Sequence, residues 1–162
     1  MATVESIKKA CTDLYRDYFD THLKTVFDNW TETDSVVLPS IGQYIYGGLG
    51  GTKAPNQYPA LSVLSGRVRE VAKFQSNVSE HEVNIALRIH LQHADTETLS
   101  KMVDRYYEAT MLLLQAYPKL DGEVYKDIHT IEASVSTTDP WENNTFVKGI
   151  QIMFWVPFVG PS

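Results

Sequence analysis

The sequence predicts an α+β fold in which two long helices pack on one face of a mainly antiparallel sheet of four to five strands. Residues 82–92 alternate polar and apolar side chains almost without a break, which is the pattern of a strand with one buried face. Apolar side chains recur every three to five residues over 4–30 and again over 96–117, which indicates two amphipathic helices. Because the elements follow in the order helix, strands, helix, strands, both helices are expected on one face of a single sheet.

The first helix is expected to run from Val4 to Trp30. Thr3 is its candidate N-cap, because its hydroxyl can accept a hydrogen bond from a backbone N–H that has no partner within the helix. The second helix is expected to begin after Asp95 or Thr96. It ends before Pro118, because proline cannot continue a helix.

Glycines and prolines punctuate residues 31–59, which predicts a long loop with room for one short strand. Structureless loops of this length are uncommon in compact domains and are usually functional or disordered. Tyr44, Ile45 and Tyr46 lie among the glycines and prolines. We therefore expect this loop to become ordered against a partner.

Residues 60–64 predict a short strand, and residues 65–77 predict a second extended piece or a turn with a charged face. The last strand, predicted over 146–158, differs from the others because both of its faces are apolar. Met153 and Trp155 project from the side opposite its core face. If helices cover that side, these residues belong to the core; if not, they form an apolar patch of the kind that marks a protein interface.

The composition is that of an ordinary globular chain of 162 residues, 43% of them apolar and 21% charged. We expect a single domain over 1–162, because this length supports one substantial core. The net charge of −6 gives a nucleic-acid backbone no general attraction. Cys11 is the single cysteine, and no apolar run approaches the ~20 residues that cross a bilayer. We therefore expect synthesis in the cytoplasm, no disulfide and no membrane segment.

The sequence carries no recognisable motif for catalysis, a cofactor or a metal. Residues 47–53 are rich in glycine, but Lys53 follows Thr52 and prolines replace the helix that a phosphate-binding loop requires, so a flexible loop is the simpler interpretation. His90 and His129 lie on the polar faces of the strands predicted over 82–92 and 128–137 and are candidates for neighbours across the sheet. A solvated sheet face explains both histidines more simply.

Arg67, Arg69 and Lys73 form the one basic cluster of the sequence. Glu70 interrupts the cluster and the chain is acidic overall. A solvated strand face or a contact with a protein partner is therefore favoured over nucleic-acid binding.

The order of these elements resembles that of the tail-terminator, or tail-completion, proteins of tailed bacteriophages. The resemblance is carried by Tyr58-Pro59-Ala60-Leu61, which enters a strand, and by residues 82–93, 96–117 and 146–158. It covers most of the chain and depends on pattern and order instead of an invariant motif.

The resemblance implies a structural virion protein of the tail-neck region, made in the host cytoplasm, without catalysis or cofactor. It implies a ring, expected to be a hexamer, that caps the tail tube, ends tube polymerisation and joins the tail to the head-side connector. DNA would pass through the lumen without specific binding, which the acidic balance of the chain suits. The residues expected at the assembly interface are Tyr44, Ile45, Tyr46, Leu49, Met153 and Trp155, with Arg67, Arg69 and Lys73 as a further partner contact.

Two alternatives stay open at this point. Another neck or tube component of the same virion would share this composition and differ in its neighbours. A small hydrolase that uses His90, His129 and nearby carboxylates is the alternative from a different class.

Overall fold

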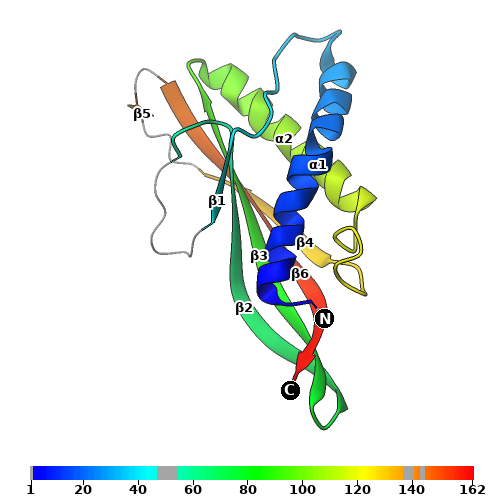
Figure 1. The fold of residues 1–162 in the computed structure, drawn as a ribbon. Coiled ribbons are helices and arrows are strands. Elements are labelled where there is room, and N and C mark those ends of the chain that lie inside the picture. Colours follow the sequence, from blue (N-terminus) through cyan, green and yellow to red (C-terminus); the bar gives the residue numbers. More distant parts are fainter. Residues whose placement is uncertain (1, 47–54, 137–140, 143–144) are drawn as a thin grey trace.

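The structure, a computed structural model, describes residues 2–46, 55–136, 141–142 and 145–162. Two helices lie against one face of a twisted sheet whose longest strands continue well beyond the helices (Figure 1). The elements are α1 (Val4–Trp30), β1 (Gln43–Tyr46), β2 (Ala60–Gln75), β3 (Val78–His93), α2 (Thr96–Ala116), β4 (His129–Val135), β5 (Trp141–Glu142) and β6 (Thr145–Pro161).

The sheet has six strands, of which five follow the order β1-β2-β3-β6-β4 while β5 pairs with β6. β1 is parallel to β2, whereas all other paired strands are antiparallel. The predicted fold class, with a mainly antiparallel sheet of four to five strands, was therefore wrong, because the sheet is mixed and larger. Side-chain alternation does not encode strand direction, and residues 47–59 are long enough for the crossover of about a dozen residues that a parallel pair needs.

Both predicted helices are present with the expected bounds. Thr3 caps α1, since its hydroxyl accepts from the Ser6 N–H at 3.1 Å while the Ser6 hydroxyl accepts from the Thr3 N–H at 2.8 Å. The carboxylate of Asp95 accepts from the Thr98 N–H at 2.9 Å and caps α2. In the described parts of the chain, no helix combines the length and the apolar character that a membrane crossing requires.

The core lies between the helices and one face of the sheet. The hydroxyls of Tyr15 on α1 and Thr110 on α2 are 2.7 Å apart, which satisfies two buried polar groups at the helix contact. The sheet contributes the alternating apolar residues that the pattern of 82–92 predicted, all with no exposed surface: Val83, Ile85, Leu87, Ile89 and Leu91.

β2 is one strand of 16 residues, not the two separate pieces that the sequence suggested. Its first five residues are buried and most of the remainder is exposed, because the second half extends past the helices toward the hairpin with β3 (Figure 1). Three register shifts against β3 interrupt this half. We call residues 66–83 the arm.

Candidate functional site

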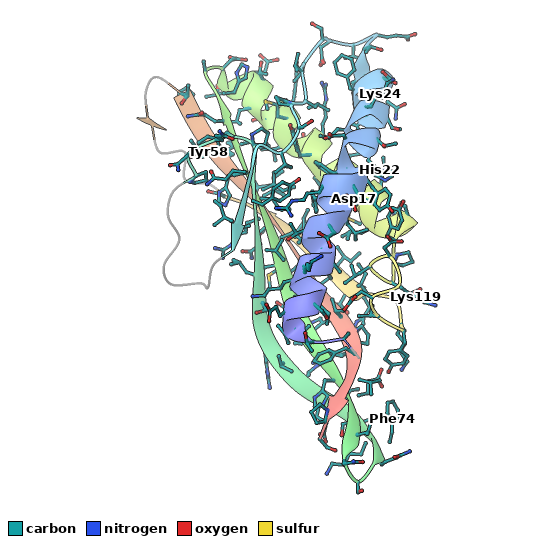
Figure 2. The ribbon with its side chains drawn as sticks, viewed as in Figure 1. Asp17, His22, Lys24, Tyr58, Phe74 and Lys119 are labelled. Carbon is teal, nitrogen blue, oxygen red and sulfur yellow. The ribbon has the colours of Figure 1, made fainter. Side chains whose placement is uncertain are left out.

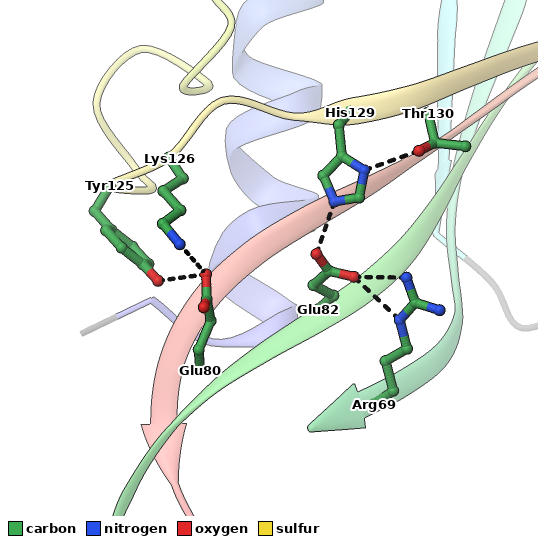
Figure 3. A network of polar contacts seen from close by, with 7 residues as sticks. All are labelled: Arg69, Glu80, Glu82, Tyr125, Lys126, His129 and Thr130. Carbon is green, nitrogen blue, oxygen red and sulfur yellow. Dashed lines mark hydrogen bonds and ion pairs between the residues drawn. The ribbon is translucent and has the colours of Figure 1, made fainter. Parts of the chain in front are cut away.

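The sheet face away from the helices carries a charged network centred on Glu82 of β3 (Figure 3). Its carboxylate accepts hydrogen bonds from the Arg69 guanidinium at 2.8 and 3.0 Å and lies 2.7 Å from Nε2 of His129. Burial raises the pKa of Glu82, but the hydrogen bonds from Arg69 and His129 outweigh burial and hold that pKa below its usual range. Glu82 is 8% exposed and is a charged carboxylate at neutral pH.

A second carboxylate of β3, that of Glu80, ties the segment before β4 to the sheet. Nζ of Lys126 lies 2.7 Å from this carboxylate, and the Tyr125 hydroxyl donates to it at 2.6 Å (Figure 3). These two hydrogen bonds hold the pKa of Glu80 below its usual value, and the one from Lys126 has the larger effect. Both buried carboxylates of this face are therefore compensated within the chain.

Met153 and Trp155, two of the predicted interface residues, are half-buried on this same face, opposite the helices. The Arg69 guanidinium lies 4.1 Å from the centre of the Trp155 ring. The Gln151 amide lies 3.1 Å from the Met153 sulfur. The second face of β6 is thus neither core beneath helices nor a bare apolar patch, because polar side chains of the sheet cover part of it.

The predicted basic cluster lies on β2, where its members are not equivalent. Arg69 is engaged with Glu82, whereas Arg67 and Lys73 are exposed and have no ion pair in the described part of the chain. The same strand also exposes three large apolar side chains, and Figure 2 shows one of them, Phe74, near the tip of the arm. They are Val68 (47%), Val71 (50%) and Phe74 (53%).

The sheet ends in two edges that have no strand partner among the described residues. β1 pairs only with residues 60–63 of β2, so the outer edge of β2 is unpaired from residue 64 onward. β4 pairs with β6 on one side and with no described strand on the other, and it exposes Val135 by 47%. Such edges are templates for pairing with another chain.

The two edges run in opposite directions. β2 and β6 are each antiparallel to β3, and β4 is antiparallel to β6, so β4 runs opposite to β2. When β4 of one copy lies beside the outer edge of β2 of another copy in a cyclic arrangement, the two strands are therefore antiparallel. The sheet could then continue from copy to copy.

β1 holds three of the predicted interface residues. Tyr44 is half-buried, and the Arg16 guanidinium of α1 lies 4.6 Å from its ring centre. Ile45 is half-buried as well, and Tyr46 pairs through its backbone with Val63. The fourth predicted residue, Leu49, lies outside the described residues.

The histidines do not form one site. His90 pairs with Gly149 of β6 and His129 pairs with Trp155, six residues further along, so the two histidines are separated by about 20 Å in the strand direction. The two histidines are therefore not neighbours across the sheet, which was the less simple of the two interpretations that the sequence allowed. Nε2 of His90 is 3.5 Å from the buried Ser62 hydroxyl. No group of three or more metal-ligating side chains occurs within the described ranges.

The sequence interpretation missed the Glu82–His129 contact and the exposed apolar residues of β2. Thr130 has a positive φ of 55°, and the register of β4 shifts between His129 and Glu132, so the alternation of this segment does not reveal where His129 lies. Val71 and Phe74 lie at register shifts of β2, where alternation also breaks down. The only usable signal for the arm was a run of apolar residues among charged ones.

Comparisons with known proteins find no family and no curated protein that matches this sequence. Among solved structures, one similar chain belongs to the virion of a native gene transfer agent (GTA) particle. It is 10% identical, the TM-score is 0.39, and the match covers 89% of this chain and 99% of the other. At this identity and TM-score, the likeness carries no argument about function or partners.

Proposed function

We propose that this chain is a structural, non-catalytic virion protein that assembles head to tail into a closed ring, as a tail terminator of a tailed bacteriophage does. The observation that carries the ring is the pair of free sheet edges with opposite strand directions, one on β2 and one on β4. An edge of one kind that joins an edge of the other kind is a heterologous contact, and such contacts form rings when the rotation closes.

The position of the edges suits a curved, closed arrangement. β4 lies beside residues 150–155 of β6, whereas the free part of β2 lies at the level of residues 153–161. The two edges are thus displaced along the strand direction. Closing a sheet into a barrel requires a displacement of this kind, because the strands must tilt against the axis.

The role at the end of the tail tube follows from the resemblance in element order. In this proposal the ring is a hexamer that ends tube polymerisation and contacts the head-side connector, with β1 available for contacts between rings. The sheet face away from the helices does not by itself support an acidic lumen, because Arg69 and Arg88 lie on it together with Glu80 and Glu82. Only the resemblance in element order supports the part of the proposal in which DNA passes through the ring.

Two lysine substitutions test the ring. Val71→Lys places a charge on the free edge of β2, and Val135→Lys places one on the edge of β4; charged edge residues oppose strand pairing. Val37→Lys is the matched control, because Val37 is 68% exposed in the segment between α1 and β1. We expect the unmodified chain and Val37→Lys to form rings in mass photometry and negative-stain images, and both edge variants to be monomers.

A mixture of the two edge variants tests whether the contact is head to tail. Each variant keeps one intact edge, so an equimolar mixture of Val71→Lys and Val135→Lys should form dimers and nothing larger. If β2 instead paired with β2 of a second copy, Val135→Lys alone would dimerise. An unmodified chain that stays monomeric at every concentration, with and without tube protein, contradicts the proposal.

The hydrolase alternative has one supporting observation, the approach of the Ser62 hydroxyl to His90. A nucleophile also needs its base to be oriented by a third group, and no hydrogen bond to Nδ1 of His90 is present in the described part of the structure. This alternative predicts an activity that His90→Ala removes, whereas the structural role predicts no activity to remove.

A further inference from the structure

A hollow with a volume of about 470 Å³ lies on the sheet face away from the helices, across β3, β6 and β4. Strand pairing arranges its floor in two rows of three residues, because residues that pair directly across strands share a face. Arg88, Gln151 and Ser134 form the first row. The second row consists of His90, Gly149 and Ser136, the last of which donates its N–H to the Gly149 carbonyl at 2.8 Å.

Gly149 makes the centre of the second row concave. A Cβ atom at this position would lie 3.8 Å from Cβ of Ser136 and 4.0 Å from Nδ1 of His90. These are ordinary contact distances, so a methyl group would fit without strain and would fill the floor. The missing side chain therefore leaves space between two groups that can form hydrogen bonds.

Arg88 supplies positive charge to the hollow that no carboxylate of the described residues neutralises. Its Nε donates to the Gln151 side-chain oxygen at 2.6 Å, and no acidic group in the described ranges lies within ion-pair distance of it. By contrast, Arg69 and Lys126 on the same face bind Glu82 and Glu80. None of the described residues that line the hollow is aspartate or glutamate.

The bond to Gln151 also orients the guanidinium. With Nε engaged, the two Nη groups have no partner among the described residues, and together they match the geometry of a two-oxygen acceptor. Burial lowers the pKa of His90, and the charge of Arg88 lowers it further, so the imidazole of His90 is neutral at neutral pH. Arg88 is thus the source of charge among the lining residues, and the remaining groups are neutral hydrogen-bond partners.

We propose that this hollow binds a compact oxyanion, a phosphate or a carboxylate, with Arg88 as its main ligand and Gln151 as the residue that positions Arg88. The proposal goes beyond the ring and does not depend on it, because all six residues belong to one copy. A half-buried guanidinium with free donors, a concave floor and an absence of lining carboxylates are the features that an oxyanion requires.

The test is an amide chemical-shift titration of the full-length chain at pH 7 with sodium phosphate, at constant ionic strength maintained with sodium chloride. A parallel titration with sodium acetate distinguishes the two oxyanions. We expect saturable shifts at Gly149 and Gln151 with at least one of the two anions. Arg88→Gln should weaken the binding at least ~10-fold, because it removes the charge-assisted bidentate contact.

Two further variants separate binding from folding. Gly149→Ala fills the floor and should weaken binding several-fold while the remaining spectrum stays unchanged. Arg67→Gln removes an exposed cation of the neighbouring strand and should change the affinity less than about twofold. Val71→Lys should bind as the unmodified chain does, so a failure of the ring does not affect this result. Shifts that never saturate, or that saturate equally in Arg88→Gln, overturn the proposal.

Discussion

The two faces of β3 bury their side chains by different means. Toward the helices, Ile85 and Leu87 have no exposed surface and are surrounded by apolar groups. On the opposite face Glu82 is only 8% exposed, yet it is surrounded by Arg69 and His129. The same strand therefore gains stability from apolar burial on one side and from paired charges on the other. The first contribution does not depend on protonation or on the screening of charges by salt, whereas the second depends on both.

The largest expected effect is on the apolar face. Leu87→Ala removes a fully buried side chain beneath the helices and should lower the free energy of unfolding by about 2–5 kcal/mol. Urea denaturation at pH 7 measures this loss of unfolding free energy. The loss should be the same at pH 5, because no titratable group is involved, and a loss below about 1 kcal/mol would mean that the helices do not pack tightly here.

A smaller effect is expected on the charged face. Glu82→Gln keeps the shape of the side chain and removes its charge, which leaves Arg69 and His129 without their anionic partner. We expect a loss of about 1–3 kcal/mol, moderated because both partners are partly exposed to water. The control is Glu132→Gln, an exposed carboxylate of β4, which should change stability by less than about 0.5 kcal/mol.

The pH dependence of Glu82→Gln sharpens the contrast between the faces. The pKa of Glu82 is lower in the folded chain than in the unfolded chain, so its contribution is complete above the unfolded value of ~4.3 and is lost as the pH falls through the folded pKa. The difference in melting temperature between the unmodified chain and Glu82→Gln should therefore shrink in acid. For Leu87→Ala the difference should persist, and parallel curves for both variants would contradict this account.

The smallest effect is expected at the margin of the charged face. Lys126→Met removes a cation whose side chain is 54% exposed, while the Tyr125 hydroxyl remains on Glu80. Because water screens an exposed ion pair, the loss should be smaller than that for Glu82→Gln and should decrease in 1 M sodium chloride. A larger loss that salt does not change would indicate that Lys126 acts through packing of its aliphatic chain instead.

The elements built from local contacts could be predicted from the sequence. Thr3 was identified as a cap, and Asp95 as one of two candidates with Thr96, because a helix N-terminus needs a side-chain acceptor within a few residues. The candidate site could not be predicted in the same way. Arg69, Glu82 and His129 come from three strands. Their contact depends on where His129 pairs with β6, and a register shift between His129 and Glu132 separates this pairing from that of the rest of β4.

What the sequence by itself determined is which side chains of α1, α2 and β3 face the core, because the periods of strands and helices are properties of the local backbone. The tertiary structure alone decided the parallel entry of β1, the unpaired outer edges of β2 and β4, and the rows that bring Arg88 beside Gln151 and His90 beside Gly149. These depend on strand order and register between residues far apart in the chain. Burial of the apolar face selects such a register, and the polar face follows it.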